Sequence, residues 1–199
     1  DLPGFSGLSG EVNGSESTGT LSINSHNLKF DAPQFMPEPL AFDTISAQSS
    51  WHTNTAGLEV KLRNVAVANA DLAGTAYGSY QTLAGSPGKV DLSVPLTRAS
   101  VPHAGRYIPL IALGTAAQQW IKTSLLEGQS SDFNLRLKGD MNDFPFADNR
   151  KGIFKIQARA KGVALEYMPG WPRIDNANTD LLIQGRELTV TAASAMTAG

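Results

Sequence analysis

The run GIFKIQARAKGVALEY, residues 152–167, decides the fold class of this chain. From Phe154 to Lys161 every second side chain is apolar, and each side chain between them is charged or an amide. A period of two residues is typical of a β-strand with one apolar face and one wet face. The run therefore predicts a strand that needs an apolar environment on one side only.

The same alternation recurs through the chain, at residues 20–31, 57–68, 89–96, 132–140 and 180–191. Turn sequences such as SPGK and PGWP separate these runs. We expect a mainly β fold, a long antiparallel meander that forms a curved sheet or gutter with an apolar concave face. A closed β-sandwich, in which two such sheets bury their apolar faces together, is the alternative.

One segment departs from this pattern. Thr115 is followed three residues later by Gln118, which is the spacing of a capping box, and Gly128 stands where a helix stop is expected. Between them Ala117, Trp120, Ile121 and Leu125 fall on one stripe at helical spacing. We predict one amphipathic helix at about 115–127, preceded by an apolar approach.

The expected organisation is a single unit over 1–199, with antiparallel strands at 1–100, the apolar approach and helix at 101–128, and further strands at 129–199. The longest apolar run, at 107–117, contains Pro109 and Gly114 and is shorter than the roughly 20 residues of a membrane span. The chain begins at Asp1 without Met and ends within an alternating pattern. We therefore expect it to be one section of a longer polypeptide.

Composition excludes several function classes. A net charge of −2 without clustered cations argues against nucleic-acid binding. No cysteine is present, so disulfides, thiolate metal sites and a cysteine nucleophile are excluded. His26, His52 and His103 are far apart and lack the spacing of a metal site, so we interpret them as loop or polar-face residues. No cofactor and no metal are expected.

The stretch DMNDFPFADNRKG, residues 140–152, concentrates Asp140, Asp143 and Asp148. It fails the EF-hand pattern, because Pro145 takes the place of the required glycine and Lys151 that of the bidentate glutamate. We predict a structural connection between two strands, with Phe144 and Phe146 folding back over an apolar end. The sequence contains no credible active site, and we do not expect an enzyme.

The segment from Tyr107 to Ile174 resembles the YhdP family, AsmA-like proteins of the Gram-negative envelope. The features that carry the resemblance are Tyr-x-Pro ahead of the helix, Leu-Lys-Gly-Asp at 137–140, Phe-Pro-Phe at 144–146 and Leu-Glu-Tyr-Met-Pro-Gly-Trp-Pro at 165–172. The resemblance implies a long periplasmic protein, anchored in the inner membrane and reaching toward the outer membrane. Phospholipid acyl chains are thought to pass along its β-gutter.

On this reading the expected partners are phospholipid acyl chains, adjoining sections of the same chain, and membranes at the ends of the full-length protein. The alternating apolar residues would line the groove, and the helix would plug its mouth or cover part of the lining. The expected lining residues are Val90, Leu92, Val94, Phe133, Leu135, Leu137, Phe154, Ile156, Val163, Leu165, Leu181 and Ile183. The expected helix plug or cover consists of Trp120, Ile121 and Leu125.

The alternative function is a structural or ligand-binding β-sandwich domain of a cell-surface protein. A dry core and aromatic residues such as Trp51 and Trp171 gathered on one loop face would favour it.

Overall fold

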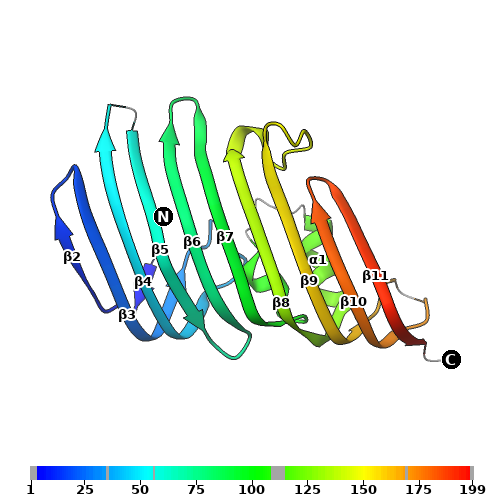
Figure 1. Cartoon of the computed structure of the whole chain (residues 1–199). Helices are drawn as coiled ribbons and strands as arrows, with labels where there is room; N and C mark the ends of the chain where they lie inside the picture. The colour runs from blue at the N-terminus through cyan, green and yellow to red at the C-terminus, as the bar shows by residue number, and fades with distance from the viewer. Residues whose placement is uncertain (1–3, 35, 56, 109–114, 169, 198–199) are drawn as a thin grey trace.

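The computed structural model describes residues 4–34, 36–55, 57–108, 115–168 and 170–197. They form one antiparallel sheet with one α-helix and short 3-10 turns (Figure 1). The strands are β1 (Gly4–Ser6), β2 (Gly10–Gly14), β3 (Thr18–Asp31), β4 (Leu40–Asn54), β5 (Gly57–Ala68), β6 (Leu72–Leu83), β7 (Ser86–Ser100), β8 (Leu125–Asp140), β9 (Gly152–Leu165), β10 (Ile174–Gln184) and β11 (Glu187–Thr197). The helical segments are η1 (Ala104–Tyr107), α1 (Thr115–Ser124) and η3 (Met141–Asp143).

Almost every strand pairs with its neighbour in the sequence. The order is β1, then β3 to β11 in succession, with β2 also paired to β3, and all pairings are antiparallel. β1 and β11 lie at opposite ends of this order, so the sheet is open. The predicted antiparallel meander is confirmed, whereas the closed sandwich, our alternative, is wrong for this chain.

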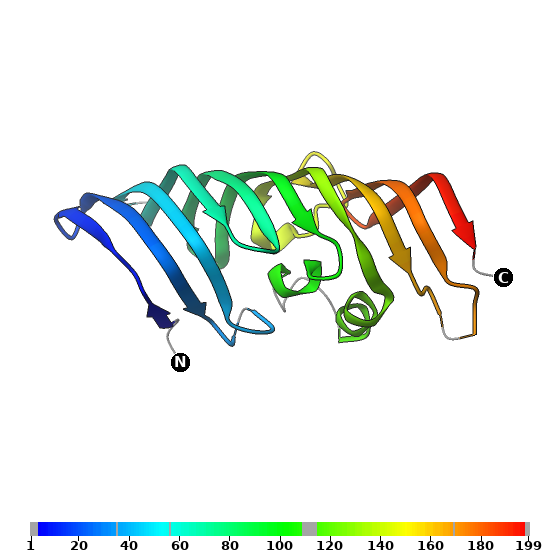
Figure 2. The ribbon, with the colours of Figure 1, turned by 90° about the horizontal axis from the view of Figure 1, so that it is seen from below.

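The sheet is arched, and η1 and α1 lie beneath the arch on its concave side (Figure 2). Because the connections join neighbouring antiparallel strands, they collect along two rims. One rim carries the connections β3–β4, β5–β6, β7–β8 and β9–β10, and we call it the helix rim because it holds η1 and α1. The opposite rim carries the connections β4–β5, β6–β7, β8–β9 and β10–β11, and we call it the hairpin rim.

The strand pairing of the curved sheet is irregular in places. The register shifts between Leu62 and Val65 on β5, and again between Ile174 and Thr179 on β10. Near the second shift, Gly162 and Asn176 have φ of 62° and 51°, in the left-handed region that interrupts regular pleating. Such bulges bend a strand and increase its twist, so they help the sheet to curve rather than lie flat.

The helix ends earlier than predicted. α1 stops at Ser124, and Leu125 already pairs with Leu165 as the first residue of β8. Gly128, predicted as a helix stop, lies within β8 with φ of 121°. Leu125 fits both the helical spacing and the strand alternation. It becomes part of the strand because it pairs with β9. The approach at 109–114 and the Thr115 side chain lie outside what the structure describes.

The buried apolar side chains lie near the rims. Toward the helix rim, Ala160, Val163 and Ala177 form a cluster against which Val101 packs. Leu28, Leu40 and Leu72, near the neighbouring connections, are also buried. At the hairpin rim Phe146 is 1% exposed. Mid-strand apolar side chains of β5 to β10 are mostly half-buried, because no second sheet covers them.

Candidate functional site

Cross-strand pairing aligns apolar side chains into rows that run across the strands. One row contains Leu21, Leu62, Leu92, Leu137 and Phe154, with Ser49 and Gly78 filling its two remaining positions. Directly paired residues share a face of the sheet. This row therefore extends along one face from β3 to β9 without a charged side chain.

A second row begins at Val94 and continues through Leu135, Ile156, Ile183 and Leu188. A third row passes from Leu96 through Phe133, Ala158 and Leu181 to Val190. These rows carry the apolar face on to β11, where Leu188 and Val190 are 62% and 56% exposed. The apolar face thus continues to the last described strand.

Ten of the twelve residues predicted to line a groove lie on this face, nine of them in the three rows and Val90 two residues before Leu92. They are Val90, Leu92, Val94, Phe133, Leu135, Leu137, Phe154, Ile156, Leu181 and Ile183. Val163 and Leu165 lie beyond Gly162, at the helix rim. Val163 is buried in the apolar cluster that it forms with Ala160 and Ala177, and Leu165 packs against that cluster.

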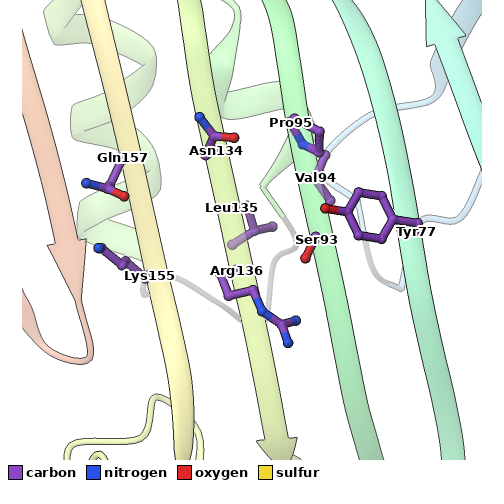
Figure 3. Close-up of a pocket in the computed structure, with 9 residues that line it drawn as sticks. All are labelled: Tyr77, Ser93, Val94, Pro95, Asn134, Leu135, Arg136, Lys155 and Gln157. Atoms are coloured by element: carbon purple, nitrogen blue, oxygen red, sulfur yellow. The ribbon is translucent and has the colours of Figure 1, made fainter.

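The opposite face of the sheet is polar. Asn134, Arg136, Lys155 and Gln157 project from it around a shallow hollow, and α1 lies behind the sheet in this view (Figure 3). Because neighbouring residues of a strand point to opposite faces, Leu135 faces the side that holds α1. The apolar rows therefore line the concave face, and the polar residues cover the convex face.

Ion pairs between strands stabilise the convex face. Asp91 lies 2.6 Å from Arg136 and 3.2 Å from Lys138. The hydrogen bond from Arg136 is the main cause that lowers the pKa of Asp91, and Lys138 lowers it further. These groups are partly exposed, so each pair adds little to stability.

The strap, by which we mean η1 and α1 together, contacts the rim rather than filling the centre of the arch. Ile121 of α1 approaches Gly105, where an added Cβ would meet its Cγ2 at 3.2 Å. Trp120 donates from Nε1 to the carbonyl of Tyr167 at 3.0 Å and is 38% exposed. Of the predicted plug residues, Trp120 and Ile121 belong to α1, whereas Leu125 is part of β8.

A polar network centred on Asp71 anchors η1. The Asp71 carboxylate lies 2.6 Å from Nδ1 of His103 and 2.9 Å from Nη1 of Arg106, and it accepts a hydrogen bond from Tyr107 at 3.1 Å. Arg106 also pairs with Glu38 at 2.6 Å. We call these five residues the latch, because they join the β3–β4, β5–β6 and β7–β8 connections.

Asn69 stabilises the latch by hydrogen bonds to Tyr107 and to the backbone of Asp71. Its amide donates to the carbonyl of Ala41 at 2.6 Å and to the hydroxyl of Tyr107 at 2.8 Å, and its oxygen accepts from the backbone of Asp71 and Leu72. The residue is buried with all of these groups satisfied. Sequence analysis missed this network, since only an Asn-x-Asp turn signal at 69–71 marks it.

Burial and ion pairing shift the pKa of Asp71 in opposite directions. Partial burial alone raises its pKa, but hydrogen bonds from Tyr107 and Arg106, with electrostatic attraction to His103 and Arg106, outweigh burial and lower it. Burial raises the pKa of Tyr107, so its hydroxyl remains a donor. The latch is therefore built around an ionised carboxylate.

The aspartates of 140–152 serve structural contacts. Asp140 accepts a hydrogen bond from Ser86 at 2.5 Å, which lowers its pKa, and Asp143 pairs with Lys151 at 2.7 Å. Phe144 lies against Phe154 with ring centroids 5.1 Å apart. Phe146 covers Gly139 and Gly152, where an added Cβ would lie 2.6 Å and 2.5 Å from its ring. The predicted fold-back of this connection is confirmed.

Trp51 and Trp171 do not lie on one loop face. Trp51 lies on β4, donating to the carbonyl of Ser15 near the hairpin rim, whereas Trp171 lies in the β9–β10 connection at the helix rim. Within the described residues no group of His, Asp or Glu is arranged to hold a metal ion. None of the helices that the structure describes is long and apolar enough to cross a bilayer.

An open, arched sheet with a continuous apolar concave face defines a β-groove protein. A sequence model of the YhdP protein family matches residues 1–199, so the chain belongs to the YhdP family. The chain is 22% identical, over 180 residues, to the intermembrane phospholipid transporter YhdP of Escherichia coli (strain K12). That match covers 90% of this chain and 14% of the relative. No solved structure matches the chain significantly.

Proposed function

We propose that this chain is one non-catalytic section of a lipid conduit, in which acyl chains of phospholipids lie along the apolar concave face. The observation that carries the proposal is the set of apolar rows on the concave face, which no second sheet covers in the part of the chain that the structure describes. An uncovered apolar face of this extent needs an apolar partner. Acyl chains fit it because the rows form a path rather than a closed pocket.

The energetics favour sliding over tight binding. Each CH₂ kept out of water contributes roughly 0.8 kcal/mol, so a 16-carbon chain exposed to water would lose on the order of 12 kcal/mol. The rows offer mainly Leu, Val, Ile and Phe side chains, and the hydroxyl of Ser49 is the one directional polar group among the row residues named above. An acyl chain can therefore move from one strand to the next while keeping similar contacts.

The dimensions are compatible with such a path. Neighbouring strands lie about 4.8 Å apart, so the nine strands from β3 to β11 extend roughly 40 Å along the rows. One leaflet of a bilayer has a hydrocarbon depth of about 15 Å, which is the space one acyl chain occupies. The section is therefore longer than a single acyl chain, and a lipid would have to pass along it.

The relative's name supplies the biological setting of the proposal. That name is intermembrane phospholipid transporter. The resemblance of residues 107–174 to the YhdP family extends the proposal: the section would belong to a longer periplasmic protein that is anchored in the inner membrane and conducts phospholipid between inner and outer membranes. Adjoining sections of that protein would continue the groove beyond β1 and β11. The conduit itself would need neither cofactor nor metal.

A matched pair of substitutions on β8 tests the proposal. Leu135→Lys places an ammonium on the concave face, and Asn134→Lys places it one residue away on the convex face. We expect native mass spectrometry of the gently purified intact protein to show bound phospholipid in the wild type and in Asn134→Lys, and most of it lost in Leu135→Lys. A folded wild type without phospholipid, or equal loss in both variants, would contradict the proposal.

A further inference from the structure

Four large exposed side chains gather at the helix rim, outside the apolar rows. Trp120 lies on α1, and Tyr167, Met168 and Trp171 lie in the β9–β10 connection, with exposed fractions between 38% and 61%. We call these four residues the rim cluster. Exposed aromatic residues concentrated in this way mark a contact surface, whereas isolated ones do not.

The ring of Tyr167 contacts the other two aromatic rings of the rim cluster at steep angles. The ring centroids of Trp120 and Tyr167 are 6.1 Å apart with planes at 75°, and those of Tyr167 and Trp171 are 5.9 Å apart at 52°. The hydrogen bond from Trp120 to the carbonyl of Tyr167 and the turn between Trp171 and Met168 hold this arrangement. The faces of adjoining rings are thus turned in different directions.

Two cations of the chain, Arg173 and Lys122, lie near the rim cluster. Arg173 binds carboxylates instead, and Lys122 points away from Trp120. Arg173 donates to Asp175 at 2.6 Å and to Glu127 at 3.1 Å. Lys122 follows Trp120 by two residues on α1, which at 3.6 residues per turn points it about 200° away. The aromatic faces therefore remain available to a cation from a ligand.

The local charge also favours a cationic group. The segments 115–128 and 165–175 together carry three carboxylates, on Glu127, Glu166 and Asp175, against the two cations of Lys122 and Arg173. Glu166, beside Tyr167, is exposed and takes part in none of the ion pairs formed by the described residues. A cation is attracted to aromatic faces within about 6 Å, and a neighbouring carboxylate adds to that attraction.

The β9–β10 connection, which carries three of the four residues of the rim cluster, begins and ends beside the apolar cluster of Ala160, Val163 and Ala177. Leu165 and Ile174, which flank the β9–β10 connection, pack on the apolar cluster of the helix rim. A lipid whose acyl chains lie on the concave face would have its polar end at a rim, where tryptophan and tyrosine suit the boundary between apolar and wet surroundings. Trp120, Tyr167 and Trp171 stand at that boundary.

We infer that the rim cluster binds the ammonium group of a phospholipid headgroup, such as ethanolamine or choline, while the acyl chains of the same lipid lie in the groove. This inference rests on the proposed function and adds a headgroup preference to it. A glycerol headgroup lacks the cation, and its lipid carries a net negative charge toward a rim with an excess of carboxylates. Lipids with ammonium headgroups are the preferred ligands.

Photocrosslinking with competition tests the inference on the intact protein. The probe is a phospholipid with a diazirine in its acyl chain, and the competitors are short-chain phosphatidylethanolamine, phosphatidylcholine and phosphatidylglycerol with identical acyl chains. For the wild type we expect the two ammonium lipids to halve labelling at about two- to fivefold lower concentration than phosphatidylglycerol.

Two variants complete the experiment. Trp171→Leu keeps an apolar side chain but removes a ring. We expect labelling of the strands to persist, and the three competitors to halve it at the same concentration. Tyr77→Leu, which removes an exposed ring from the convex face, should retain the wild-type preference. Equal competition in the wild type, a preference that persists in Trp171→Leu, or one lost in Tyr77→Leu would overturn the inference alone. Absence of acyl-chain labelling in the wild type would instead overturn the proposed function, and the inference with it.

Discussion

The carboxylate of Asp71 lies 2.6 Å from Nδ1 of His103, and this contact joins the β5–β6 connection to the segment that leads into the helix. Asp71 is the residue on which the latch converges, since Arg106 and Tyr107 bind the same carboxylate. Its side chain is only 12% exposed. The position of η1 therefore depends on one partly buried anion.

Replacing this anion should loosen the strap. Asp71→Asn removes the charge but keeps the size, and we expect the free energy of unfolding to fall by about 1–3 kcal/mol because charge-assisted hydrogen bonds are lost from a partly buried site. Hydrogen exchange measured by mass spectrometry should accelerate most in 101–107. Asp43→Asn, at an exposed site on β4 outside the latch, is the control, and equal acceleration in both variants would refute the latch.

The latch should also make stability depend on pH on the acid side. The pKa of Asp71 is lowered in the folded protein, so the folded state holds its proton less tightly than the unfolded state does. The stability that ionised Asp71 contributes is then complete above about pH 5 and is lost as the pH falls below about 4, through the lowered folded pKa. The difference in urea midpoint between wild type and Asp71→Asn should shrink between pH 6 and pH 3. A difference that is constant over this range would contradict the prediction.

The sequence predicted the strands well and their assembly less well. Alternation such as that of Leu135 between Asn134 and Arg136 defines two faces but not their curvature, so gutter and sandwich remained open. The curvature depends partly on bulges near Gly162 and Asn176, whose backbone conformation no periodicity reveals. The latch was missed for a different reason, because Asp71 and His103 meet only when two connections come together at one rim.

Phe146 and Gly139 should be energetically coupled. The Phe146 ring is almost fully buried over Gly139, which has φ of 140° and lacks room for a Cβ. Phe146→Ala should destabilise the protein by about 3 kcal/mol through loss of a buried ring. Gly139→Ala should destabilise it because the new methyl group meets that ring in a backbone conformation unsuited to alanine.

A double-mutant cycle measures this coupling. In the Phe146→Ala background the ring is gone, so Gly139→Ala should be less damaging by at least about 1 kcal/mol, while the backbone strain remains. Thermal or urea unfolding of the four proteins supplies the numbers. If the destabilising effects of Phe146→Ala and Gly139→Ala were strictly additive, the two residues would not be energetically coupled.

The apolar rows allow folding and lipid binding to be separated, because Leu92 and Leu137 are cross-strand partners on the concave face. Leu92→Lys or Leu137→Glu alone should abolish phospholipid binding and also lower stability. The double variant places opposite charges face to face, which should recover roughly 0.2–1 kcal/mol of stability. Phospholipid binding should not recover, since an ion pair in the row still leaves an acyl chain against charged groups that need water.

Native mass spectrometry and urea unfolding of the wild type, the two single variants and the double variant measure phospholipid binding and stability. Recovery of phospholipid together with stability would mean that the apolar rows matter for folding alone.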